Sequence, residues 1–347
     1  MDQNEILFTT QACKHGQLGL ITLNRPSVLN ALNHAMFLAL DEQLATWEAN
    51  PEIQAVIIQA VPGRAFSAGG DIRSAYERAQ KNDPHLTDFF KDEYRLDKRV
   101  FHFSKPYIAL LNGITMGGGA GISINGAHRV VTQQFSFAMP ETGIGFFPDV
   151  GASYFLSRLP GSFGLYLALT GARITAADCL ALGLVDYFVD ANSFPEILAQ
   201  LCEIDLQQDA ASSVKKCLQQ CVITNEKSEL MEHVAEINLC FAKPSVEEIM
   251  QALSQYPNPW CTQVLQVLNT KSPTSLKVTF QQIRLGATLD FDACIDMEFK
   301  MTCQFMQAHD FFEGVRAAII DKDQTPQWQP AHLADVTTEA LQKYCVF

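Results

Sequence analysis

The sequence predicts an α/β fold in which short strands alternate with helices, followed by a helical C-terminal region. Apolar runs at residues 18–23, 55–59 and 107–111 are each followed by a loop and a helical pattern. Strands connected in this way lie parallel to one another, with the helices packed outside. Beyond about residue 193, apolar residues recur at helical spacing almost to the C-terminus. We therefore expect a core at residues 1–192 and a helical region at residues 193–347.

The first two strands show how this pattern is built. The strand at residues 18–23 contains threonine among apolar residues, and the turn Asn24-Arg25-Pro26 ends it. Asn33 can cap the next helix, whose apolar residues recur at steps of three and four until Pro51. The strand at residues 55–59 then leads to a glycine turn and to a helix whose first turn carries Asp71.

Later elements repeat the pattern. The strand at residues 107–111 leads into a turn with three adjacent glycines, and a fourth strand at residues 129–132 leads towards Pro140 and Glu141. Residues 176–188 add a helix and a short strand. In the helical region, prolines at 257, 259 and 273 predict two breaks between helices.

Composition excludes several classes of function. Among 347 residues, 25 are basic and 38 acidic, which gives a net charge of −13 and disfavours nucleic acid or an anionic membrane as partner. The ten cysteines show no paired spacing, so we interpret them as buried, reduced thiols. The N-terminus lacks the features of a signal peptide, and no apolar run has the length of a membrane span. We therefore expect a cytoplasmic protein.

The segment from Met116 to Asp149 contains the main candidate functional residues. Its three adjacent glycines let the backbone turn sharply from a strand to a helix, which exposes N–H groups to a ligand oxygen. Glu141 and Asp149 follow in a setting of glycine, proline and phenylalanine, where an apolar wall raises the pKa of a carboxyl group. Donors and acids in one segment suggest chemistry on a carbonyl group.

With these residues in hand, the chain resembles the crotonase (enoyl-CoA hydratase/isomerase) superfamily over nearly its whole length, and within it the 3-hydroxyisobutyryl-CoA hydrolase branch. A glycine triplet alone would be weak support, but the resemblance rests on several ordered blocks. These blocks are FSAGGDI (66–72), GITMGGG (113–119), FAMPET (137–142) with FPDVG (147–151), KSPTSLK (271–277), and HDF (309–311) with EGVR (313–316). The last two blocks lie in a C-terminal extension that generic hydratases of the superfamily lack.

The resemblance implies a fold, a substrate class and site residues. The fold is a spiral of strand-strand-helix turns with a helical C-terminal region that completes the site. The implied substrate is an acyl-CoA, so coenzyme A is part of the substrate and no cofactor is expected. The implied roles are as follows: the backbone N–H groups of Gly70 and Gly118 form the oxyanion hole, and Glu93, Ala68 and Asp71 bind substrate, Ala68 through its backbone at the adenine end.

The residue at position 121 distinguishes the hydratases of the superfamily from its hydrolase branch. Hydratases carry two glutamates that hold the water added across a double bond, and the first of these positions is Gly121 here. Glu141 remains at the second position, and Asp149 stands where hydratases typically have glycine. This pattern resembles the hydrolase branch. Glu141 would act as a general base or as a nucleophile, and Asp149 would orient water or a substrate hydroxyl.

Structural roles remain as alternatives for these residues. Glu141 could be an ordinary first residue of a helix, Asp149 could cap the next helix, and Glu93 could be a solvated surface residue. Gly70 and Gly118 could serve only as turn residues. Ser67 replaces the cysteine common in its motif. No histidine has the spacing of a metal site, so no metal is expected.

Phe146 and Phe147 fit an acyl-pocket wall or a packed core equally well.

Two further functions stay open. A single glutamate at the position of Glu141 can move a proton between two carbons, which would give an enoyl-CoA isomerase, and hydratase-type activity belongs to the same class. Alternatively, the fold could be kept as an inactive scaffold. Members of the superfamily often form trimers or hexamers, so the resemblance suggests a homo-oligomer. It also suggests the mitochondrial matrix if the source is eukaryotic, although no transit peptide is visible.

Overall fold

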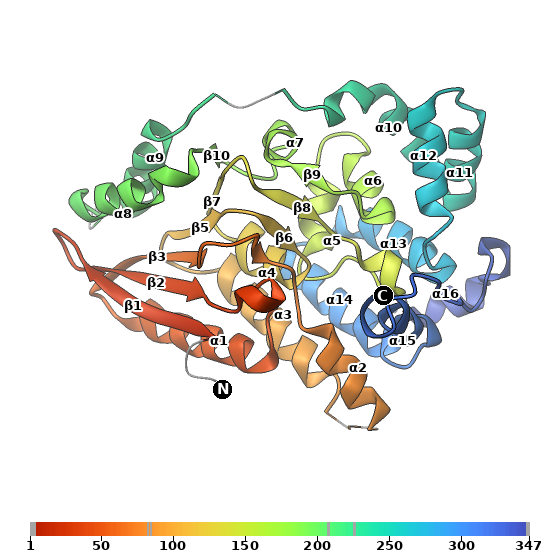
Figure 1. Ribbon diagram of the computed structural model, residues 1–347, viewed down its shortest axis with the longest axis horizontal. Coiled ribbons are helices and arrows are strands. Elements are labelled where there is room, and N and C mark those ends of the chain that lie inside the picture. Colours follow the sequence, from red (N-terminus) through yellow and green to blue (C-terminus); the bar gives the residue numbers. More distant parts are fainter. Residues whose placement is uncertain (1–4, 82, 84, 207–208, 225–226, 345–347) are drawn as a thin grey trace. The chain divides into compact units, whose positions relative to one another are not determined.

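The computed structural model describes residues 5–81, 83, 85–206, 209–224 and 227–344. The chain divides into two compact units, and each unit is built from three separate segments of the sequence (Figure 1). The first unit comprises Met1–Gly70, Arg95–Phe137 and Ile174–Ser228. The second unit comprises Asp71–Tyr94, Ala138–Arg173 and Glu229–Phe347.

The first unit contains two sheets and the helices that cover them. Its strands are β1 (Ile6–Ala12), β2 (Gln17–Leu23), β3 (Ile53–Ala60), β4 (Ala65–Ser67), β5 (Tyr107–Leu111), β6 (Ile114–Met116), β7 (His128–Val131), β8 (Ser136–Ala138), β9 (Ile174–Thr175) and β10 (Tyr187–Phe188). Its helices are η1 (Pro26–Val28), α1 (His34–Ala49), α4 (Gly118–Ile124), α7 (Ala176–Ala181), η4 (Ala191–Ser193), α8 (Phe194–Glu203) and α9 (Ala210–Gln220). The last residue of β8, Ala138, already belongs to the second unit.

The larger sheet has the strand order β1-β2-β3-β5-β7-β10. All neighbours are parallel except β1, which runs antiparallel to β2. The prediction of parallel strands at residues 18–23, 55–59, 107–111 and 129–132 is therefore confirmed. The strand β1 was not predicted, because most of its side chains lie at an exposed edge and show no clear alternation.

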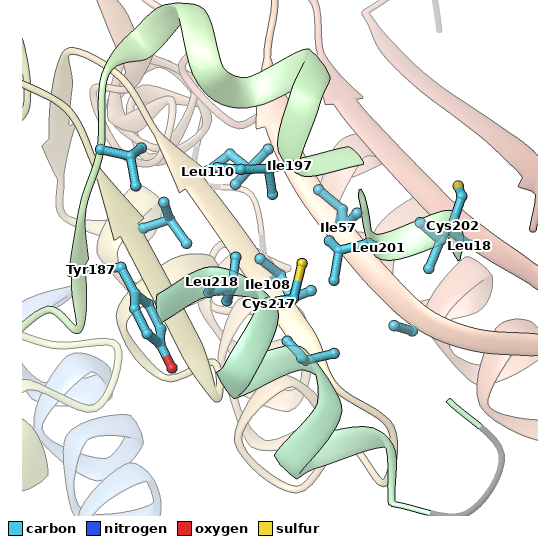
Figure 2. Packing of buried hydrophobic residues seen from close by; sticks show 14 of the residues in the cluster. Leu18, Ile57, Ile108, Leu110, Tyr187, Ile197, Leu201, Cys202, Cys217 and Leu218 are labelled. Carbon is cyan, nitrogen blue, oxygen red and sulfur yellow. The ribbon is translucent and has the colours of Figure 1, made fainter. Parts of the chain in front are cut away.

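A packed apolar face fixes the register of this sheet. Because side chains alternate along a strand, Leu18, Ile57 and Ile108 point to the same side as Leu110. Figure 2 shows this face together with the side chains of α8 and α9, among them Ile197, that form one cluster with it. A shift by one residue would turn the whole apolar row away from these helices.

The smaller sheet has the order β4-β6-β8-β9, with β4 parallel to β6 and β8 antiparallel to β9. Its strands are two or three residues long, too short for a periodic pattern to reveal them. This sheet positions the two glycine turns, because one turn follows β4 and the other follows β6.

The second unit is mainly helical. Its elements are α2 (Ile72–Gln80), the start of α3 (Asp88–Phe101), η2 (Glu141–Ile144), α5 (Ala152–Phe155), η3 (Leu156–Arg158), α6 (Phe163–Thr170), η5 (Leu230–His233), α10 (Val234–Phe241), α11 (Val246–Gln255), α12 (Pro259–Leu268), α13 (Pro273–Gly286), α14 (Phe291–Phe305), α15 (His309–Val315), the π-helix η6 (Arg316–Ile320), η7 (Leu333–Asp335) and α16 (Thr338–Tyr344). The two predicted breaks are confirmed: Asn258 caps α12 and Ser272 caps α13, each directly before a proline.

The described cysteines are free thiols, most of them buried. Along the described chain, no helix combines the length and the apolar character needed to cross a membrane.

Candidate functional site

The two glycine turns of the first unit lie against each other. β4 and β6 are paired in parallel, so the turns that follow them start side by side. Gly69 and Gly117 have φ angles of +104° and +47°, a backbone region that favours glycine. A Cβ atom on Gly69 would lie 3.1 Å from the carbonyl oxygen of Met116 and 3.5 Å from the nitrogen of Gly118. The structure thus brings the turns of Gly70 and Gly118 together.

Both turns lead into helices. Gly118 is the first residue of α4, and Gly70 directly precedes Asp71, the N-cap residue of α2. Asp71 therefore lies one position before the helix rather than in its first turn. N–H groups at helix starts lack intrahelical partners and favour a negatively charged oxygen. Gly118 has such a position, whereas Gly70 lies two residues before the first helical residue of α2.

Ser67 and Ala68 fix the first turn. The Ser67 hydroxyl donates to the carbonyl of Asn30 over 2.9 Å and accepts the N–H of Gly69 over 3.2 Å. The Ala68 N–H donates to the carbonyl of Leu29 over 2.9 Å. The predicted contact of Ala68 with a ligand would therefore use its carbonyl oxygen.

Glu141 is the first residue of η2 in the second unit. Its side chain is buried, and no residue in the described part of the chain hydrogen-bonds its Oε2 atom. Burial raises the pKa of this carboxyl well above its usual range, and the charge of Asp149 raises it further, whereas the charge of Lys271 opposes the shift. A buried carboxylate oxygen without a protein partner is available to a substrate or to water.

Asp149 is also buried and has one defined partner. Tyr94 donates its hydroxyl to Oδ2 of Asp149 over 2.7 Å, and the same hydroxyl lies 2.7 Å from Oγ1 of Thr302. Burial raises the pKa of Asp149 to about 7, although the Tyr94 hydrogen bond opposes the shift. Gly151, not Asp149, is the N-cap residue of α5. The alternative that the Asp149 side chain caps this helix is therefore wrong.

Glu93 precedes Tyr94 in α3 and is only 2 % exposed. The alternative of a solvated surface residue is therefore wrong. The charges of Asp149 and Glu93 both contribute to raising the Tyr94 pKa, although burial contributes most. The second unit thus gathers Glu93 and Asp149 around one tyrosine, and Asp149 interacts electrostatically with Glu141.

Tyr94, Thr302 and Glu298 were not predicted as site residues from the sequence. Glu298 lies in α14 and is fully buried, and its carboxylate accepts the N–H groups of Gly151 and Ser153 over 2.8 and 2.9 Å. The sequence could have indicated Glu298, because it is a charged residue on the apolar face of a helix. Charged side chains are rarely buried unless they have a polar partner or a function.

Two C-terminal motifs hold the Glu141 turn. A Cβ on Gly145, whose φ is +69°, would lie 2.1 Å from the carbonyl oxygen of Asp310. A Cβ on Gly314 would lie 2.2 Å from the backbone of Ile144. The N–H of Ser272 donates to the carbonyl of Thr142 over 3.2 Å. The blocks KSPTSLK and HDF with EGVR therefore pack directly on this turn.

Lys271 adds a cation near the turn. Its Nζ would lie 3.1 Å from a Cβ placed on Gly143. Burial lowers the pKa of Lys271, and the charge of Glu141 opposes that shift. Lys271 therefore favours the ionised form of Glu141.

Phe146 and Phe147 belong to an aromatic cluster. Their ring centroids are 4.5 Å apart, and Phe146 lies 5.2 Å from Phe311 while Phe147 lies 5.2 Å from Phe305. Both side chains are almost fully buried. Core packing accounts for these contacts.

The described residues contain no group of three or more histidine, cysteine or acidic side chains that could hold a metal ion.

Comparisons with known proteins agree with this architecture. A family model described as enoyl-CoA hydratase/isomerase matches residues 18–345. The chain is 44% identical to a mitochondrial 3-hydroxyisobutyryl-CoA hydrolase of Gallus gallus over 94% of this chain and 86% of that protein. It is 42% identical to the protein of the same name from Homo sapiens, over 95% of this chain and 86% of the relative.

Solved structures show the same fold. A carnitinyl-CoA dehydratase from Mycobacterium thermoresistibile is similar with a TM-score of 0.89 and 34% identity, over 97% of this chain and 96% of that one. An enoyl-CoA hydratase from Rhodobacter sphaeroides 2.4.1 gives a TM-score of 0.87 and 34% identity, with the same coverage. The fold is the α/β crotonase fold, with two mixed sheets and a helical C-terminal region. The chain belongs to the enoyl-CoA hydratase/isomerase family.

Proposed function

We propose that this protein hydrolyses the thioester of a short-chain 3-hydroxyacyl-CoA, with 3-hydroxyisobutyryl-CoA, an intermediate of valine breakdown, as substrate. The observation that carries the proposal is the pair of buried carboxyl groups of Glu141 and Asp149, combined with glycine at position 121. Hydration of a double bond would lack one of its two glutamates. Thioester cleavage requires one base or nucleophile and one group that orients the attack, and this pair supplies both.

Glu141 is the proposed catalytic carboxylate. In a direct route, Glu141 takes a proton from water while the water oxygen attacks the thioester carbon. The C–S bond then breaks, and the proton passes to the leaving thiolate. In a covalent route, a Glu141 oxygen attacks instead, and the C–S bond breaks so that coenzyme A leaves as a thiolate. Water then cleaves the resulting anhydride, which restores the Glu141 carboxylate, frees the product carboxylate and releases two protons, one of which the thiolate takes up. A raised pKa makes Glu141 a stronger base, and its Oε2 atom lacks a partner within the described chain.

Asp149 is proposed to orient water or the substrate hydroxyl. Tyr94 binds Oδ2 of Asp149, so the tyrosine fixes the direction of the carboxylate while the second oxygen serves the substrate. Glu93 is proposed to accept a hydrogen bond from the acyl hydroxyl. Its burial directly before Tyr94, the residue that binds Asp149, supports such a role.

Gly70 and Gly118 are proposed to bind the thioester oxygen through their N–H groups. This oxygen gains negative charge as the carbonyl carbon is attacked, and a preorganised donor in comparable sites contributes roughly 3 kcal/mol to transition-state stabilisation. The contact between the two glycine turns supports a joint role. Ala68 and Asp71, on either side of Gly70, are proposed to contribute to substrate binding.

The names of the relatives divide between two reactions. Proteins with 42 to 44% identity are called 3-hydroxyisobutyryl-CoA hydrolases, whereas the two solved structures with 34% identity carry dehydratase and hydratase titles. The residues Gly121 and Asp149 support hydrolysis of the thioester over hydration of a double bond.

A thiol-release assay over a panel of acyl-CoAs tests this proposal. The wild type should release thiol from 3-hydroxyisobutyryl-CoA or 3-hydroxypropionyl-CoA. Glu141→Gln and Asp149→Gly should each lose roughly 100-fold or more in rate, while coenzyme A still raises the melting temperature. Absence of thiol release by the wild type would contradict hydrolysis.

Two other outcomes identify the alternatives. Deuterium exchange into an enoyl-CoA without thiol release would indicate an isomerase. A protein that coenzyme A does not stabilise against heat would instead be a scaffold.

Three expectations stay predictions: that residues 193–347 complete the site, that the protein forms a trimer or hexamer, and that it acts in the cytoplasm or, like the relatives named mitochondrial, in the matrix.

A further inference from the structure

The backbone that follows Asp149 is strained. Val150 has a φ of +55° and Gly151 a φ of +90°. Glycine adopts this left-handed region easily, but a β-branched residue such as valine does so only when its surroundings hold it there. The turn that presents Asp149 therefore depends on contacts from neighbouring elements.

Glu298 provides the most direct of these contacts. One carboxylate oxygen accepts the N–H of Gly151 over 2.8 Å, and the other accepts the N–H of Ser153 over 2.9 Å. Glu298 is 0 % exposed, so both hydrogen bonds form away from solvent. Gly151 directly follows the strained Val150, and Ser153 follows after one further residue, Ala152.

Gln282 of α13 holds the same turn from its other side. Its Nε2 donates to the carbonyl of Pro148, directly before Asp149, and to Oγ of Ser153 over 2.8 Å. Gln282 is as fully buried as Glu298. Side chains from two helices therefore fix the backbone before and after Asp149.

The same face of α14 also reaches the Asp149 carboxylate. Thr302 lies four residues after Glu298, one helical turn along the same face. Thr302 contacts the hydroxyl of Tyr94, and Tyr94 donates to Asp149. Thus α14 supports both the backbone of Asp149 and, through Tyr94, its carboxyl group.

A purely structural role for Glu298 would be to cap α5. That helix has only four residues, and a neutral serine or asparagine commonly satisfies such N–H groups. Burying a full carboxylate for this purpose is costly, and more so beside another acid. The cost favours a role beyond capping, namely the support of the strained turn at Val150.

We propose that Glu298 is a positioning residue for Asp149, which holds the strained turn by accepting the N–H groups of Gly151 and Ser153 and so directs the Asp149 carboxylate. The inference rests on the proposed function, in which Asp149 contacts the substrate or the attacking water. Glu298 does not itself touch the reacting atoms in this proposal.

A charge effect accompanies the geometric one. Titratable groups interact with Asp149 from three elements: Tyr94 of α3, Glu141 of η2 and Glu298 of α14. Burial raises the pKa of Glu298 to about 8, hydrogen bonds from Gly151 and Ser153 oppose this shift, and the charge of Asp149 adds to it. Asp149, with a pKa of about 7, ionises before Glu298, so the repulsion between the two acids acts mainly on the ionisation of Glu298.

The test compares Glu298→Gln with Glu298→Asp in the thiol-release assay across pH. Glu298→Gln should lower kcat roughly 10- to 100-fold with little change in KM, because a misdirected Asp149 affects the transition state more than binding. The acidic limb of its pH profile should stay near the wild-type position, because Glu298 ionises above Asp149. Glu298→Asp keeps the carboxyl group but shortens the side chain, so it should lose contact with the N–H groups of Gly151 and Ser153, and its kcat should also fall.

Leu253→Ala serves as the control for lost stability. Leu253 is a buried residue of α11, and truncation should lower the melting temperature without changing kcat or the pH profile. The proposal is overturned if Glu298→Gln keeps the wild-type kcat. It is also overturned if Glu298→Gln and Glu298→Asp lose no more kcat than Leu253→Ala at an equal loss of melting temperature.

A readout without catalysis separates this inference from the proposed function. If the wild type releases no thiol from any acyl-CoA, the proposed function fails. The carbon NMR titration of the Glu298 carboxyl then tests the link between the two acids directly. Its midpoint should move to lower pH in Asp149→Asn, which removes the Asp149 charge, and stay in place in Leu253→Ala. An unmoved midpoint in Asp149→Asn would refute the coupling.

Discussion

Tyr94 and Asp149 form a buried hydrogen bond of 2.7 Å within the second unit. Ionised Asp149 can only accept, and a tyrosine has one hydroxyl proton, so Tyr94 donates to Asp149 and the Thr302 hydroxyl donates to Tyr94. The two hydrogen bonds thus run in series from Thr302 through Tyr94 to the carboxylate of Asp149. Residues that are 55 and 208 positions away from Tyr94 in sequence are thereby joined in one network.

Replacing Tyr94 by phenylalanine should raise the pKa of Asp149 beyond about 7, because the hydrogen bond that stabilises its charge is lost. A hydrogen bond to a charged group contributes roughly 1.5–3 kcal/mol, which corresponds to a shift of about 1–2 pH units. The acidic limb of kcat against pH should move upwards by that amount. Activity should recover at alkaline pH. A loss of activity that is equal at every pH would contradict this assignment.

The raised pKa of Asp149 also predicts how stability depends on pH. The native state holds a proton between pH 3.8, the usual value, and about 7, whereas the unfolded state has released it. The contribution of Asp149 to stability therefore falls as pH rises through this window, and the loss is complete above it. Asp149→Asn should gain about 1–3 kcal/mol relative to the wild type as pH rises from about 5 to about 8. Urea unfolding at several pH values measures this difference, and parallel curves would refute it.

Gly119→Ala should disturb the glycine turns. The new Cβ would lie 2.7 Å from the backbone oxygen of Ser67, which is too close for a real contact. Relief of this clash must move β4 and α4 apart, so both the melting temperature and thiol release should fall. Gly63→Ala is the matched control, because its Cβ would lie 3.7 Å from the nearest atom, the oxygen of Val61. Equal effects of the two substitutions would show that the turn contact is unimportant.

Ser272→Ala should destabilise the support of the Glu141 turn. The Ser272 hydroxyl donates to Oδ2 of Asp310 over 2.6 Å and accepts the N–H of Ser275 over 3.1 Å, and both side chains are buried. Loss of a buried cap and of a bond to a carboxylate should lower the free energy of unfolding by roughly 2–3 kcal/mol.

The matched control for that substitution is Ser245→Ala, which removes a more exposed N-cap from α11. Its cost should be about 1 kcal/mol or less. Denaturant unfolding compares the two variants, and a cost no larger at Ser272 than at Ser245 would count against the network.

Much of the fold was accessible from local patterns. The strand at residues 18–23, the helix capped by Asn33 and the breaks before Pro259 and Pro273 all depend on neighbours in sequence, and the structure confirms them. The short strands β4 and β6 escaped prediction because they exist only through their pairing with each other. Periodicity cannot appear in three residues.

The sequence by itself determined the fold class, the family and the residue types at Glu141, Asp149 and Gly121, because these follow from periodicity and from motifs that are contiguous in the chain. Only the tertiary structure decided that Asp149 meets Tyr94 and that Glu298 lies beneath the turn. Burial and hydrogen bonding between distant segments set the pKa of each carboxyl. These quantities depend on which surfaces the folded chain removes from water, and no local pattern contains that information.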